Sequence, residues 1–107
     1  PMRIDFRAVN LELAADFRDF VEEHVQTALG RLDQHVRSVL VQIRDVNGPK
    51  GGNDIHCHIE LTMPYGSPLL VEESNSTPAN ALNKALHRLK PALLRRVDAH
   101  KNHHTHS

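Results

Sequence analysis

Three basic residues near the end of the chain have the spacing of a phosphate-binding helix face. Lys84, Arg88 and Arg95 follow one another at intervals of four and seven residues, so in an α-helix with 3.6 residues per turn they lie on one side. Lys and Arg donate charge-assisted hydrogen bonds to phosphate oxygens. A basic row that meets only water has the same spacing. The pattern is therefore compatible with a nucleic-acid partner and with a simple solvated face.

The distribution of charge favours a polyanionic partner more than its total does. The chain has 13 Lys and Arg against 13 Asp and Glu, a net charge of zero, but residues 77–107 contain six Lys and Arg and one Asp. Clustering on one face, more than net charge, makes an electrostatic footprint. The residues that we predict to contact nucleic acid are Lys84, Arg88, Lys90, Arg95, Arg96 and Lys101, with Lys50 and Arg44 in addition.

Histidine and cysteine give weaker signals. His56 and His58 alternate on one face of a predicted strand, where two ligands without a third make a weak metal site. We expect them to be solvated and expect no metal. Cys57, on the opposite face of that strand, is expected to be an inert core thiol, and a single cysteine excludes an internal disulfide. No nucleophile–base pair or carboxylate dyad has a usable spacing, so we predict no enzymatic activity, no cofactor and no small-molecule substrate.

Hydrophobic periodicity predicts the elements that position these residues. Apolar residues alternate with polar ones near residues 2–7, 39–44, 55–62 and 69–72, which predicts four strands. Residues from Leu13 to Leu32 have a helical period with an acidic back. A second helix is expected from Thr77 to Lys101, with its buried stripe formed by Leu82, Leu86, Leu89, Leu93 and Val97.

The second predicted helix has a start signal and one interior proline. Thr77 can accept a backbone hydrogen bond as the N-cap, and Pro78 suits the first helical position, where no donor is needed. Pro91 removes the bond to the carbonyl of His87. Both residues face outward, so water can satisfy that carbonyl, and we expect a bend and not a break.

These elements predict an α+β domain with two layers and the order β-α-β-β-β-α. Both helices should pack on one face of a four-stranded mixed sheet, because only the apolar rows of the strands offer them a surface. Gly and Pro residues between Asn47 and Asn53 predict a hairpin loop. We expect one domain over residues 1–101 and a flexible His-rich tail over residues 102–107. Without an apolar run long enough to span a membrane or a signal-like N-terminus, we expect a cytoplasmic protein with no membrane partner, as a monomer.

Three stretches of the sequence resemble one known family. They are MRIDFRAVNLELAADFRDFVEEHV at the start, DVNGPKGGNDIHCHIEL in the middle and ALNKALHRLKPAL near the end. Together they cover most of the chain and resemble the ribosome hibernation-promoting factors, also called the ribosome-associated inhibitor or protein Y family. In this resemblance Arg88 matches a Lys of the family and Asn83 an Asp. Ala79 stands where a Tyr is usual, and Pro91 where many members have a basic residue.

The resemblance implies a small non-enzymatic protein that occupies the mRNA and tRNA channel of the small ribosomal subunit. Such a protein contacts ribosomal RNA and silences idle bacterial ribosomes under stress. The alternative is a protein-interaction or regulatory module that has kept the fold and does not bind ribosomes. Zero net charge and the acidic back of the first helix favour that alternative.

Overall fold

The computed structural model describes residues 2–46 and 54–105, with side chains as far as Asn102. The predicted order of strands and helices is confirmed, with one additional short 3-10 helix. The loop predicted over residues 47–53, including Lys50, lies outside the described residues. The elements are β1 (Arg3–Val9), α1 (Phe17–Leu29), the 3-10 helix η1 (Gly30–His35), β2 (Ser38–Asp45), β3 (Ile55–Thr62), β4 (Leu69–Asn75) and α2 (Pro78–Thr105).

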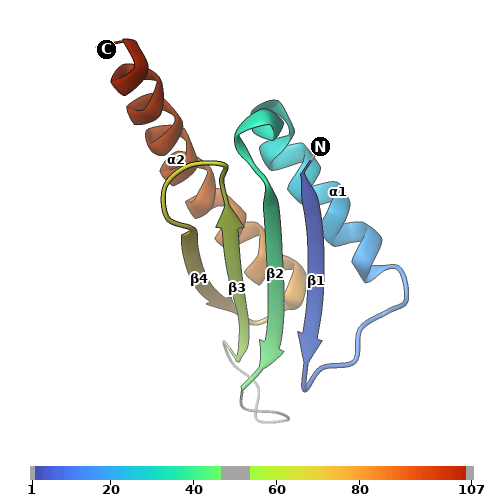
Figure 1. The fold of residues 1–107 in the computed structure, drawn as a ribbon. Helices are drawn as coiled ribbons and strands as arrows, with labels where there is room; N and C mark the ends of the chain where they lie inside the picture. The colour runs from blue at the N-terminus through green and yellow to red at the C-terminus, as the bar shows by residue number, and fades with distance from the viewer. Residues whose placement is uncertain (1, 47–53, 106–107) are drawn as a thin grey trace.

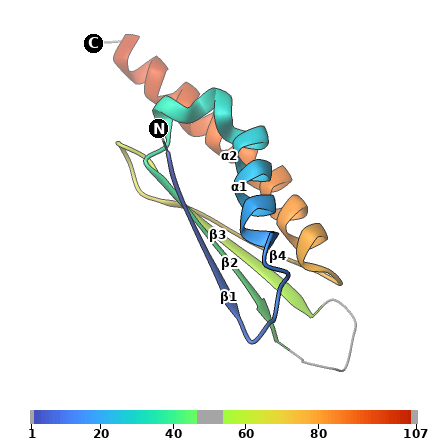
Figure 2. The same ribbon diagram turned by 90° about the vertical axis from the view of Figure 1, so that its right-hand side faces the viewer.

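The four strands form one mixed sheet in the order β1-β2-β3-β4. β1 and β2 are parallel, and β2–β3 and β3–β4 are antiparallel, so the sheet is mixed, as predicted. A helix must carry the chain back between two parallel neighbours, and α1 does so. Both helices cover the same face of the sheet, so the other face is open to solvent (Figure 1 and Figure 2). The predicted two-layer α+β architecture is confirmed.

The core lies between the sheet and the helices. Alternate residues of β3, from Ile55 to Leu61, are buried. The stripe predicted for α2 faces them, and all five of its members, Leu82, Leu86, Leu89, Leu93 and Val97, are buried. Cys57 is fully buried among them, and burial raises the pKa of its thiol to about 12. This side chain therefore stays protonated and inert at neutral pH.

The prediction that the first helix begins at Leu13 is wrong. α1 begins at Phe17, and the preceding residues form the connection that brings the chain from the end of β1 onto the helical face. Asn10 turns the chain there with φ 55°. Leu13 lies one helical turn before Phe17, so apolar spacing alone could not separate the connection from the helix.

α2 is longer than predicted and runs without interruption through Pro91. Thr77 caps its start, because its Oγ1 accepts a hydrogen bond from the backbone N–H of Asn80 at 3.1 Å. Pro91 and His87 are both exposed, as expected. The helix passes the predicted end at Lys101 and continues to Thr105, because no Gly or Pro follows Pro91 to end it. This end of α2 extends beyond the edge of the sheet (Figure 1).

The tail predicted over residues 102–107 therefore starts inside α2, and the division of the chain at Lys101 stays a prediction. α2 is also the longest helix of the described residues. Neither it nor any other helix in this part of the chain has the length and apolar character required to cross a bilayer.

Truncation of Leu89 tests the orientation of α2. Leu89 is fully buried, whereas Leu94 on the same helix is 40% exposed. We expect Leu89→Ala to lower the free energy of unfolding by about 2–5 kcal/mol, because it removes packed atoms and leaves a cavity. Leu94→Ala is the matched control, with an expected change of about 0.5 kcal/mol or less. Urea denaturation measures both, and equal losses would contradict this orientation.

Candidate nucleic-acid interface

The basic residues of α2 lie on different sides of the helix. Lys84, Arg88 and Arg95 are exposed on the side away from the core, as their spacing predicts. Lys90 is exposed on the side that faces α1, and Lys101 is exposed near the end of the helix. With Arg96, six of the predicted contact residues therefore lie on this helix. We call the exposed row of Lys84, Arg88 and Arg95 the α2 face.

An acidic residue of β4 lies beside two members of the α2 face. Glu73 forms ion pairs with Arg88 and with Lys84, whose Nζ lies 3.5 Å from the Glu73 Oε1. The same Nζ donates a hydrogen bond to the backbone carbonyl of Ser74 at 3.4 Å. The hydrogen bond from Arg88 is the main cause that lowers the pKa of Glu73. Glu73 is therefore ionised at neutral pH and compensates part of the charge of the α2 face.

Arg96 has a partner inside the fold. Its side chain is half-buried, and Nη1 donates a hydrogen bond to the backbone carbonyl of Ser67 at 2.7 Å. Gly66 makes this approach possible, since it has φ 72° and a Cβ there would lie 2.8 Å from Nη1. One turn further along α2, the ring of His100 stacks on Tyr65 at 3.5 Å between centroids. Arg96 thus fastens α2 to the β3–β4 connection.

Arg95 and Lys90 differ from the two α2 cations that form ion pairs with Glu73. Among residues 2–46 and 54–105, neither takes part in an ion pair. Lys90 borders a groove of about 750 Å³ between α1 and α2, whose lining includes Leu86, Pro91 and Leu94. The ammonium group of Lys90 and the guanidinium group of Arg95 are therefore available to an incoming anion.

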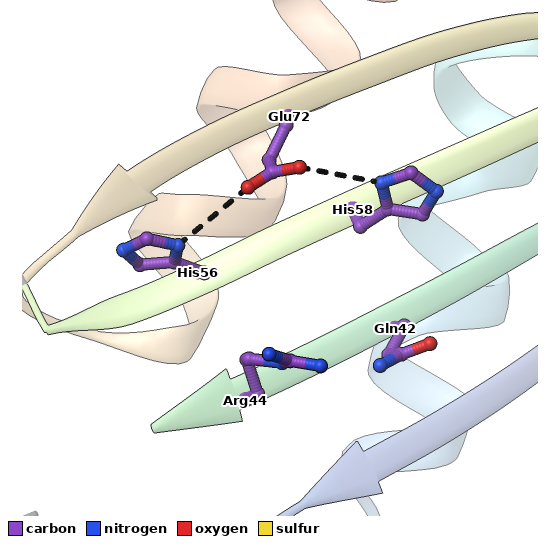
Figure 3. Close-up of a pocket in the computed structure, with 5 residues that line it drawn as sticks. All are labelled: Gln42, Arg44, His56, His58 and Glu72. Atoms are coloured by element: carbon purple, nitrogen blue, oxygen red, sulfur yellow. Dashed lines mark ion pairs between the residues drawn. The ribbon is translucent and has the colours of Figure 1, made fainter. Parts of the chain in front are cut away.

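Arg44 belongs to a different surface. It lies on the open face of the sheet, in a hollow of about 290 Å³ that Gln42, His56, His58 and Glu72 also line (Figure 3). The Glu72 carboxylate oxygens lie 3.7 Å from His56 Nδ1 and 3.6 Å from His58 Nδ1. This surface has mixed charge, and it lies on the face of the sheet opposite the helices (Figure 2). At the β4 edge it adjoins the α2 face, because His56, Glu72 and Arg88 line a further hollow together.

The sequence alone did not indicate that Glu72 lies beside the two histidines. Glu72 is the direct partner of His58 in the β3–β4 register, so only a known hairpin register could have revealed it. The two histidine side chains are 36% and 37% exposed. Within the described residues, no three or more His, Cys, Asp or Glu side chains form an arrangement that could hold a metal ion.

The fold and the α2 face define a class of small two-layer α+β proteins with one basic helix. Within that class the chain belongs to the Sigma 54 modulation protein / S30EA ribosomal protein family, whose model matches residues 4–101. This match confirms the resemblance to the hibernation-promoting factors. No curated protein sequence matches the chain.

Two solved structures have a similar fold. The crystal structure of the Thermus thermophilus Protein Y N-terminal domain is 23% identical, with a TM-score of 0.69 over 88% of this chain and 98% of that chain. A ribosomal subunit interface protein from Coxiella burnetii is 14% identical, with a TM-score of 0.71 over 91% of this chain and 99% of that chain. Proteins with low sequence identity to this chain thus have the same architecture.

The neighbours Arg95 and Arg96 allow a test of their different environments. We expect Arg96→Ala to lower the free energy of unfolding by about 1 kcal/mol, because it removes a charge-assisted hydrogen bond and the packing of a long side chain. Arg95→Ala should change this energy by about 0.5 kcal/mol or less. Urea denaturation of the two variants gives the comparison. An Arg96→Ala variant as stable as Arg95→Ala would refute the fastening role of Arg96.

Proposed function

We propose that this chain is a ribosome-associated, RNA-binding inhibitor of translation, a hibernation factor of the cytoplasm. It binds the small ribosomal subunit in the mRNA and tRNA channel when ribosomes are idle under stress. Membership of the S30EA ribosomal protein family supports ribosome association. The similarity of its fold to protein Y and to a ribosomal subunit interface protein agrees with this assignment.

The α2 face is the observation that carries the proposal. Its first and last cations are eleven residues apart, which corresponds to about 16 Å of helix axis at 1.5 Å per residue. That length reaches several consecutive phosphates of an RNA strand. Phosphate contacts hold a protein in place and carry no base information. An inhibitor that occupies a channel of fixed shape needs position and affinity, and the α2 face supplies contacts of this kind.

A protein-interaction or regulatory module is the second candidate. Asp19, Glu22 and Glu23 are exposed on α1 and give the helical layer an acidic side beside the basic one. Acidic side chains repel RNA phosphates, and they suit a basic protein partner. A module of this kind would keep the fold and use the helical layer without any ribosome.

Co-sedimentation with small ribosomal subunits at several salt concentrations separates the two functions. We expect the wild type to bind and to dissociate as salt increases, because phosphate binding releases counterions. A triple variant with Lys84, Arg88 and Arg95 changed to Gln should bind weakly. The slope of log affinity against log salt should be less steep by about 0.7–0.9 for each phosphate that the variant no longer neutralises.

The β1–β2 side of the sheet provides a control with the same change of charge. Arg3, Arg7 and Arg37 are exposed there and are not among the predicted contacts, so changing all three to Gln should leave most of the affinity intact. Circular dichroism establishes that both variants are folded. If the folded α2 variant co-sediments as the wild type does, the proposed RNA contact fails, and the interaction module becomes the better description.

A further inference from the structure

Glu73 occupies an unusual position in the sheet. β4 is an edge strand, and in its register Glu73 lies opposite Cys57, whose side chain is in the core. Glu73 therefore faces the helices, whereas its neighbour Glu72 faces the open side of the sheet. An acidic side chain stands where the alternation of the strand would place an apolar one. It lies at the rim of the core, directly beneath two cations of α2.

The carboxylate is shared by two residues one helical turn apart. Lys84 contacts Oε1 and Arg88 contacts Oε2. The Glu73 side chain is only 15% exposed, but those of Lys84 and Arg88 are 54% and 66% exposed. An approaching phosphate therefore reaches the cations first and finds a fixed negative charge behind them.

This arrangement has a cost for binding of phosphate. The three side chains together carry one net positive charge, although they include two cations. A cation already neutralised by a carboxylate releases fewer counterions from the RNA when it binds, and the carboxylate also repels the phosphate. The two cations are each more than half exposed, and an ion pair with a solvent-exposed partner adds little to stability. The position of Glu73 thus affects the strength of anion binding more than it affects the fold.

We propose that Glu73 attenuates RNA binding by the α2 face, as a built-in counter-charge for Lys84 and Arg88. The inference rests on the proposed function and adds how the strength of binding is limited. In a chain of zero net charge, one of the negative charges lies directly beside the basic site. A protein that must leave the ribosome when translation resumes needs a contact that is not too tight. Glu73 sets that limit without any change in the fold.

Glu73→Gln tests the proposal, with Glu72→Gln as the matched control. Both variants remove one negative charge from the same strand, but Glu72 pairs with His56 and His58, whereas Glu73 pairs with Lys84 and Arg88. Gln keeps an oxygen that can accept the hydrogen bond from Arg88. We expect Glu73→Gln to bind small subunits more tightly, by up to about tenfold near 0.1 M salt, with a salt dependence steeper by about one counterion. Glu72→Gln should stay within about twofold of the wild type. A Glu73→Gln affinity equal to or weaker than that of Glu72→Gln would overturn the proposal.

A second comparison uses a background in which Lys84 and Arg88 are both changed to Gln. It shows whether the gain in affinity from Glu73→Gln depends on these two cations. In that background Glu73→Gln should increase affinity by less than half as much, on the logarithmic scale, as in the wild type. An undiminished gain would mean that Glu73 acts through overall charge, and the proposal would fail. Thermal melts of all variants establish that they are folded.

A second probe separates this inference from the proposed function. Binding to single-stranded polyuridylic acid depends on phosphate contacts without requiring a ribosome. If the wild type fails to bind small subunits, the proposed function fails. The Glu73 inference is then decided by whether Glu73→Gln binds this RNA more tightly than Glu72→Gln does.

Discussion

The packing of one apolar stripe of α2 against the sheet is the constraint on which the rest of the structure depends. Its five residues are buried against β3 and β4, and this packing sets the rotation of the helix about its axis. Once that rotation is set, Lys84, Arg88 and Arg95 must point outward. The side chain of Arg96 must point toward the β3–β4 connection. The basic face is thus a geometric consequence of the core, and its residues contribute little to holding the fold together.

Because the core specifies this fold, the charges on its surface can differ between proteins that share the same architecture. The fold is shared with proteins that are 23% and 14% identical to it, because apolar periodicity and turn chemistry specify the layers. Ion pairs at the surface, such as those of Glu73, lie outside that specification. Affinity for a polyanion can therefore be tuned at β4 and α2 independently of stability. Net charge alone is a poor guide to the partner of a chain like this one.

Periodicity predicted the fold well because it reports which face of each element is buried. The four strands, the layers and the α2 stripe all followed from it. It could not say where α1 begins, since Leu13 and Phe17 have the spacing of a single helix. Periodicity also could not predict the C-terminal end of α2. The segment after Lys101 is polar, so it has no apolar stripe, and it contains no Gly or Pro that would end the helix.

The site was predicted less completely, for a different physical reason. The exposed basic row depends on one helix and was visible in the sequence. The partners of Lys84, Arg88 and Arg96 come from β4 and the β3–β4 connection, so they depend on strand register and on how α2 crosses the sheet. β4 was expected near residues 69–72, whereas it continues to Asn75. That extension is what places Glu73 beneath α2.

Directed hydroxyl-radical probing of the ribosomal complex tests most directly the claim that α2 lies against small-subunit RNA. Cys57 is buried and its pKa is raised to about 12, so an introduced surface cysteine can be labelled selectively with an iron chelate. Asp98 on the outer side of α2 and Glu12 in the connection between β1 and α1 are both exposed and lose the same charge when changed to Cys. We expect cleavage of small-subunit RNA from position 98 and little from position 12. Equal cleavage from both positions, or cleavage from position 12 alone, would contradict this claim.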